Sequence, residues 1–79
     1  MNRITARLQK IIDGQTHCCS VTTTQCRDTG KWGYMVRTYI SELPQRHTTT
    51  TWVESQEQAE SCVQTLIFNK LSENYTECK

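Results

Sequence analysis

The chain has 79 residues, of which 35% are hydrophobic and 22% charged, and its formal net charge is +1 at pH 7. This length predicts a single domain over residues 1–79 with a small core, because a chain of this size buries only about 60% of its unfolded surface. No apolar run reaches the ~18 residues of a membrane span, and residues 1–14 lack the apolar block of a signal peptide. We therefore expect a cytoplasmic protein that does not contact membranes, located in the host cell if a phage encodes it.

The charges are unevenly distributed along the chain. Residues 1–41 hold six Lys or Arg and two Asp or Glu, whereas residues 42–79 hold three and six. This asymmetry predicts a directional electrostatic field that can orient a charged partner. It is weaker than the basic charge of a dedicated nucleic-acid-binding protein.

Residues 3–13 are predicted to form an amphipathic helix. Apolar residues follow the i, i+4, i+7, i+8 spacing of a helix, namely Ile4, Leu8, Ile11 and Ile12. Gly14 follows, at the place where a left-handed residue would end the helix. The opposite helix face carries a basic stripe made of Arg3, Arg7 and Lys10. This stripe is either a solvated surface or a contact with phosphates or an acidic protein.

Three strands are predicted next, over about 17–26, 31–40 and 46–54. The turn sequence Asp28-Thr29-Gly30-Lys31 predicts that the first two form a hairpin. Residues alternate in the second strand, and we place its more apolar set under the helices. That set is Trp32, Tyr34, Val36 and Ile40. The outward set, Met35, Arg37 and Tyr39, has the composition found at interface centres.

The third strand contains four consecutive threonines before Trp52 and Val53. Threonine favours extended backbone and tolerates water, so this run predicts a strand with a wet face at the sheet edge. Pro44 precedes it and indicates a loop. An exposed edge of this kind could pair with its own copy in a homodimer.

The last helix is predicted over about 56–72. Ser55 and Gln58 have the spacing of a capping box at its start. One stripe of the helix is apolar and consists of Ala59, Cys62, Val63, Leu66, Ile67 and Leu71. Phe68 points away from that stripe, and it either packs under the tail around Tyr75 or belongs to a contact surface.

The predicted fold class is α+β, in the order helix, three-stranded antiparallel sheet, helix (αβββα). Both helices have a single apolar stripe, so we expect them to cover one face of the sheet together. The other face is then left to solvent or to a partner.

The sequence predicts no catalytic, metal or cofactor site and therefore a protein that is not an enzyme. His17, Cys18 and Cys19 are residue types found in thiol enzymes. The side chains of adjacent strand residues point to opposite faces, however, and the sequence shows no acid that would orient the imidazole. Zinc sites usually space their cysteines two to four residues apart, and no such pair is present. Five cysteines are compatible with a redox or metal protein built on Cys18, Cys19 and Cys26, although reduced thiols are the simpler interpretation.

The predicted element order resembles the double-stranded-RNA-binding domain, and residues 54–71 resemble the start and apolar rhythm of its last helix. The resemblance implies the fold more than the activity. That family places lysines at the start of this helix to contact phosphates, where this chain has Gln56, Glu57, Gln58 and Glu60. By size and type the chain also resembles small phage-encoded inhibitors such as anti-CRISPR proteins.

We predict a non-enzymatic binding protein that blocks a surface of a larger protein or ribonucleoprotein, most concretely a phage or mobile-element anti-defence inhibitor. The predicted partner-binding residues are Arg27, Lys31, Met35, Arg37, Tyr39 and Phe68. The alternative is a degenerate nucleic-acid-binding module of the double-stranded-RNA-binding type that uses Arg3, Arg7 and Lys10.

Overall fold

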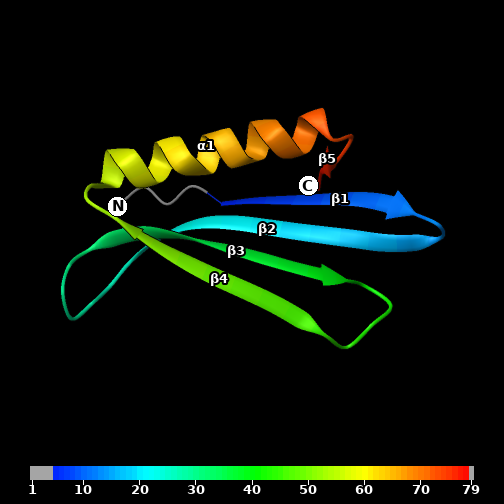
Figure 1. Ribbon diagram of the computed structural model, residues 1–79, viewed down its shortest axis with the longest axis horizontal. Helices are drawn as coiled ribbons and strands as arrows, with labels where there is room; N and C mark the ends of the chain where they lie inside the picture. The colour runs from blue at the N-terminus through cyan, green and yellow to red at the C-terminus, as the bar shows by residue number, and fades with distance from the viewer. Residues whose placement is uncertain (1–4, 79) are drawn as a thin grey trace.

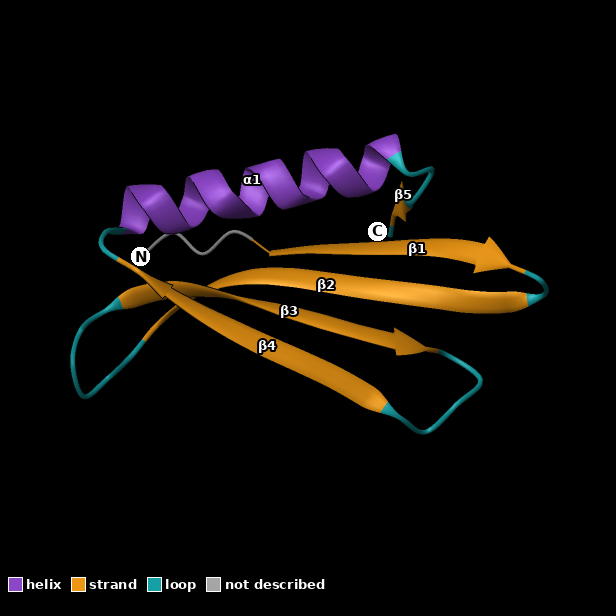
Figure 2. Cartoon of the chain, viewed as in Figure 1, coloured by secondary structure: helices purple, strands orange, loops and turns teal. Residues whose placement is uncertain are grey.

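The computed structural model describes residues 5–78, which form an antiparallel sheet crossed by one helix (Figures 1 and 2). The elements in chain order are β1 (Thr5–Ile12), β2 (Gln15–Gln25), β3 (Trp32–Ile40), β4 (Arg46–Val53), α1 (Gln56–Ser72) and β5 (Thr76–Glu77). The described helix is not long and apolar enough to cross a membrane.

The first described element is a strand, so the predicted helix over 3–13 is wrong for residues 5–12; Arg3 and Ile4 lie outside the described residues. The reason is the turn that follows. Asp13 and Gly14 both have positive φ, 51° and 80°, and Ile12 pairs directly with Gln15. Two such residues form the tight turn that matches the twist of a hairpin, which commits residues 5–12 to pairing with β2.

The sheet has five strands in the order β4-β3-β2-β1-β5, all antiparallel, so the predicted three-stranded αβββα fold is also wrong. The short β5 pairs with β1 through Leu8 opposite Glu77 and Gln9 opposite Thr76. The Cys78 N–H donates to the Arg7 carbonyl at 2.7 Å and extends this pairing. Consequently β1 is paired on its outer side around residues 7–9, and the sheet ends at the eight-residue β4 on one side and the two-residue β5 on the other.

One face of the sheet packs against α1 and holds the core. Leu8, Val21 and Val63 are 1%, 0% and 0% exposed, and together with Cys19 they form one cluster. Partly buried side chains surround this cluster, namely Tyr34, Val36, Leu66, Ile67 and Tyr75. Of the inward set predicted for the 31–40 strand, Tyr34 and Val36 pack against this core, and the described residues form a single helix over the sheet (Figure 2).

Both ends of α1 are fixed by local hydrogen bonds. The Ser55 hydroxyl accepts from the Gln58 N–H at 3.1 Å, and the Gln58 side-chain oxygen accepts from the Glu54 N–H, also at 3.1 Å. At the other end Asn74 has a φ of 74°, which turns the chain back toward the sheet. Lys10 holds this turn because its Nζ donates to the Glu73 carbonyl at 2.7 Å.

Candidate binding surface on the open face of the sheet

The face of the sheet opposite α1 is called the open face here, because no described element covers it. Cross-strand pairing arranges most of its residues in four rows, and a fifth pair, Ile11 with Thr16, follows at one end. The rows are Thr24, Gly33 and Trp52; Thr5, Thr22, Met35 and Thr50; Arg7, Ser20, Arg37 and Thr48; and Gln9, Cys18, Tyr39 and Arg46. Three of the residues in these four rows are arginines and none is Asp or Glu, so the rows carry positive charge. Glu42 lies beside Thr16, where its carboxylate accepts from the Thr16 N–H at 2.9 Å.

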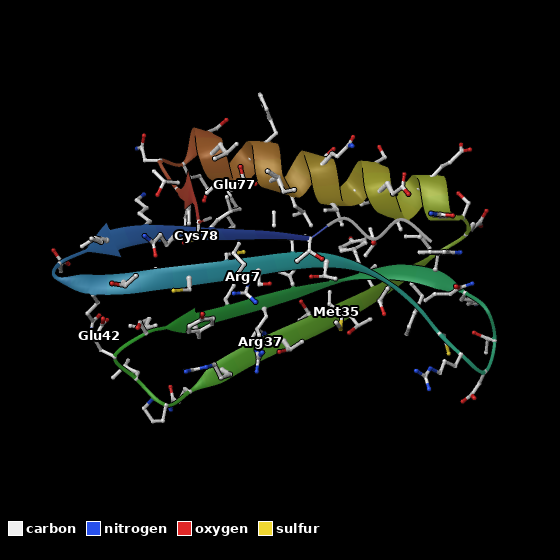
Figure 3. The ribbon with its side chains drawn as sticks, turned by 180° about the vertical axis from the view of Figure 1, so that it is seen from behind. Arg7, Met35, Arg37, Glu42, Glu77 and Cys78 are labelled. Carbon is white, nitrogen blue, oxygen red and sulfur yellow. The ribbon has the colours of Figure 1, made fainter. Side chains whose placement is uncertain are left out.

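Arg7 and Arg37 lie in the middle of the open face, on either side of Ser20 (Figure 3). Their Cα atoms are two strand spacings apart, about 10 Å. Neither guanidinium makes a hydrogen bond or an ion pair with any described residue; the one described ion pair joins Lys70 and Glu73 on the other side of the molecule. Two like charges left unpaired in this way create a site that an anion would stabilise.

A hollow of about 350 Å³ lies at this point of the sheet. Its lining includes both guanidinium-bearing residues and four neutral polar or thiol side chains of the same face, which are Gln9, Cys18, Ser20 and Cys78, together with the Tyr39 ring. All of these except Cys78 belong to two adjacent rows. The hollow therefore offers hydrogen-bond donors and an aromatic ring beside two positive charges.

Tyr39 and Arg46 form a stacked pair at one end of the open face. The guanidinium carbon of Arg46 lies 4.4 Å from the centre of the Tyr39 ring. Two further bonds hold this geometry, because Nη1 of Arg46 donates to the Leu43 and Gln45 carbonyls at 2.8 and 3.1 Å. Stacking and backbone bonds leave the charge of Arg46 in place while they restrict its motion.

Trp52 lies at the other end of the open face, over Gly33 on the neighbouring strand. A Cβ atom at Gly33 would come within 2.7 Å of Cε3 of the Trp52 ring and 2.5 Å of the Thr51 carbonyl oxygen. The glycine therefore allows the indole to lie close against the backbone of β3, and this arrangement protects the glycine from water. The Trp52 residue remains 47% exposed, so the indole is also available to a ligand.

A larger hollow of about 500 Å³ lies beyond the end of α1, between the 41–45 loop and the tail. Its lining includes two imidazoles and several apolar groups, namely His17, His47, Ile40, Leu43 and Tyr75. No group of three or more potential metal ligands occurs among the described residues. Arg46 is the one arginine in its lining, so this hollow carries less positive charge than the open face, which has Arg7 and Arg37 as well.

The five cysteines are all free thiols in different surroundings. Burial raises the pKa of the Cys19 thiol in the core. Hydrogen bonds from the Thr29 side chain and from the Thr29 and Asp28 backbone lower the pKa of the Cys26 thiol in the β2–β3 turn.

The structure separates the residues predicted to bind a partner. Met35, Arg37 and Tyr39 share the open face, whereas Arg27 and Lys31 lie in the β2–β3 turn at its end. Phe68 is 69% exposed on α1, which excludes the predicted packing under the tail and places it on the opposite side of the molecule.

The predicted basic stripe is divided in the same way. Arg7 is on the open face, but Lys10 is on the covered side, where its Nζ lies 5.8 Å from the centre of the Tyr75 ring. Arg46, Trp52 and Ser20 were not predicted as site residues. Their positions on the open face follow from the register between strands. In the sequence, the only signal that could have identified Arg46 and Trp52 was the alternation of side-chain direction within residues 46–54.

Comparison of the chain with protein-family models, curated proteins and solved structures found no match in any of the three.

Proposed function

We propose that this protein is a small non-enzymatic binding module that docks a larger, negatively charged partner through the open face. The observation that carries this proposal is the arrangement of Arg7, Arg37 and Arg46 on an uncovered sheet face whose four rows contain no carboxylate. Unpaired arginines on a fixed backbone can engage an anionic surface without first breaking internal ion pairs.

The other side chains of the open face support the same function. Tyr39, Met35 and Trp52 accompany the arginines, and these residue types are enriched at the centres of interfaces. Their backbone is held in a continuous four-strand ladder, so little ordering is required on binding. A cytoplasmic role as an anti-defence inhibitor is a more specific version of this proposal, with the docked surface belonging to a nucleic-acid-dependent complex.

A site-specific photocrosslinker tests which surface docks, whatever the identity of the partner. We would place p-benzoylphenylalanine at Thr48 on the open face and, as the matched control, at Thr65 on α1. Both positions are exposed threonines. In cells that express the chain, we expect a discrete crosslinked product from position 48 and none from position 65.

The charge requirement is tested in the same experiment. Adding Arg37→Glu to the position-48 protein should abolish the product, while Lys70→Glu on the helix side should leave it. Crosslinks that form from position 65 alone, or that survive Arg37→Glu, would overturn the proposal.

A further inference from the structure

We propose that the partner of the open face is a single-stranded nucleic acid, whose phosphates bind the arginines and whose bases stack at the ends of the face. This inference rests on the proposed function and names the chemistry of the partner. Three features of the open face fit such a partner: the central arginine pair, the two aromatic ends and the spacing between them.

The central pair provides the phosphate site. Arg7 and Arg37 approach the hollow from the strands on either side of β2, with the Ser20 residue between them. Guanidinium groups bind phosphate oxygens in bidentate geometry, and a hydroxyl can donate a further bond. A phosphate in this hollow would relieve the mutual repulsion of two guanidiniums that otherwise have no described partner.

The two ends provide flat stacking surfaces. Trp52 lies close over the Gly33 backbone and is 47% exposed, so a base can stack on the outer side of its ring. At the opposite end the guanidinium of Arg46 lies over Tyr39 at 4.4 Å, and a planar guanidinium accepts a base on its outer side as an aromatic ring does.

The spacing of the rows suits a short extended strand. Neighbouring rows of one face are two residues apart, about 6.7 Å, so the four rows span roughly 20 Å. Trp52 is in the first row, Arg37 in the third and Arg46 in the fourth. Along the face an aromatic ring is followed by a guanidinium and then by the stacked Tyr39–Arg46 pair. A single strand of about four nucleotides can cover this distance.

The distribution of charge directs a polyanion to this side. Glu57 on α1 and Glu77, the register partner of Leu8, lie away from the open face, and Glu42 lies at its end beside Thr16. A duplex fits less well, because its bases are stacked inside and could not reach Trp52, whereas an unpaired strand presents both bases and phosphates.

Fluorescence anisotropy tests the inference with a fluorescein-labelled oligothymidylate of ten nucleotides and the full chain. At about 50 mM salt we expect saturable binding, tighter than to a duplex of the same length. Arg7→Ala with Arg37→Ala should weaken binding more than tenfold and reduce the magnitude of the slope of log K against log salt by about 1.4, which corresponds to two lost phosphate contacts on a single strand. Lys70→Gln is the matched helix-side control and should change neither value.

Stacking has an independent readout. Trp52→Ala should weaken binding roughly 5- to 150-fold. In a Trp32→Phe background, where Trp52 is the remaining tryptophan, bound oligonucleotide should quench its fluorescence. Circular dichroism of each variant identifies any loss of folding, and the quenching experiment retains the Trp52 side chain and so does not depend on that variant.

Any of four results would overturn this inference. The folded protein does not bind the oligonucleotide at low salt, it binds a duplex equally well, it binds poly-glutamate equally well, or Lys70→Gln weakens binding as much as the double arginine variant does. If the oligonucleotide fails while position 48 still crosslinks to a protein in an Arg37-dependent manner, the proposed docking function holds and the nucleic-acid partner is excluded. If position 48 yields no crosslink either, both proposals fail.

Discussion

The two faces of the same sheet are built from alternate residues of the same strands, yet they have opposite physical roles. Leu8 and Val21 point to α1 and are almost fully buried, whereas their chain neighbours Arg7 and Ser20 point to the open face. The covered face supplies most of the apolar burial that stabilises so small a domain. The open face is therefore free to carry unpaired charge, and the following variants measure how complete that separation is.

The largest expected effect is on the covered face. Leu8→Ala should lower the free energy of unfolding by about 2–5 kcal/mol, because it leaves a cavity where the side chain is 1% exposed. Thr48→Ala on the open face is the control and should change it by less than about 0.5 kcal/mol. Urea denaturation measures both, and equal effects would show that the faces do not differ in this way.

Gly33 is the position where the open face should matter for stability. Gly33→Ala should cost about 1–3 kcal/mol, since the new Cβ would lie 2.7 Å from the Trp52 ring and 2.5 Å from the Thr51 carbonyl oxygen. Thr50→Ala, on the same strand as Trp52, should be nearly neutral in the same urea titration. A neutral Gly33→Ala would indicate that the indole does not lie against the strand.

Cysteine alkylation compares the core with the β2–β3 turn. The thiolate is the reactive species, so the lowered pKa and partial exposure of Cys26 should make it react first and at lower pH than an ordinary cysteine. Cys19 should stay unmodified in the folded protein, because burial both shields it and raises its pKa. Mass spectrometry after limited iodoacetamide treatment identifies the order in which the cysteines are alkylated.

The hydrogen bond to Thr29 can be removed directly. Thr29→Val should move the pH profile of Cys26 alkylation upward, whereas Thr24→Val, outside the turn, should leave it in place. An unchanged profile in Thr29→Val would show that the Thr29 hydroxyl does not stabilise the thiolate.

The smallest expected effect is that of Arg37→Ala on stability. The guanidinium has no described partner and faces Arg7 across Ser20, so removing it should change the free energy of unfolding by no more than about 0.5 kcal/mol. At low salt the substitution should slightly raise the free energy of unfolding, and this effect should disappear as salt screens the repulsion between the two guanidiniums. A clear loss of stability would mean that Arg37 supports the fold and is not reserved for a ligand.

Local signals were sufficient for the elements from β2 to α1 and insufficient for β1 and β5 at the two ends of the described residues. The helix predicted over 56–72 coincides with α1, because its cap and its apolar stripe are both encoded within a few residues of each other. The apolar residues within 5–12 also fit the period of a helix. Their strand conformation depends on partners from 15–22 and 76–77, and the Asp13-Gly14 turn that signals the pairing was interpreted as a helix end.

The candidate site was predictable only strand by strand. Alternation within 31–40 identified the side that carries Met35, Arg37 and Tyr39. The juxtaposition of Arg37 with Arg7, and of Trp52 with Gly33, depends on register between strands distant in sequence. No periodicity within a single segment contains that information.

The pairing of β5 with β1 has a consequence for how the chain is made. The β1–β2 hairpin leaves the ribosome before residues 76–78, and until those residues follow the backbone of β1 has no described partner on its outer side. Throughout synthesis the nascent chain therefore exposes an unprotected strand margin that could join another polypeptide. Substitutions that prevent residues 76–78 from pairing should accordingly promote aggregation even though they remove no side chain of the core cluster.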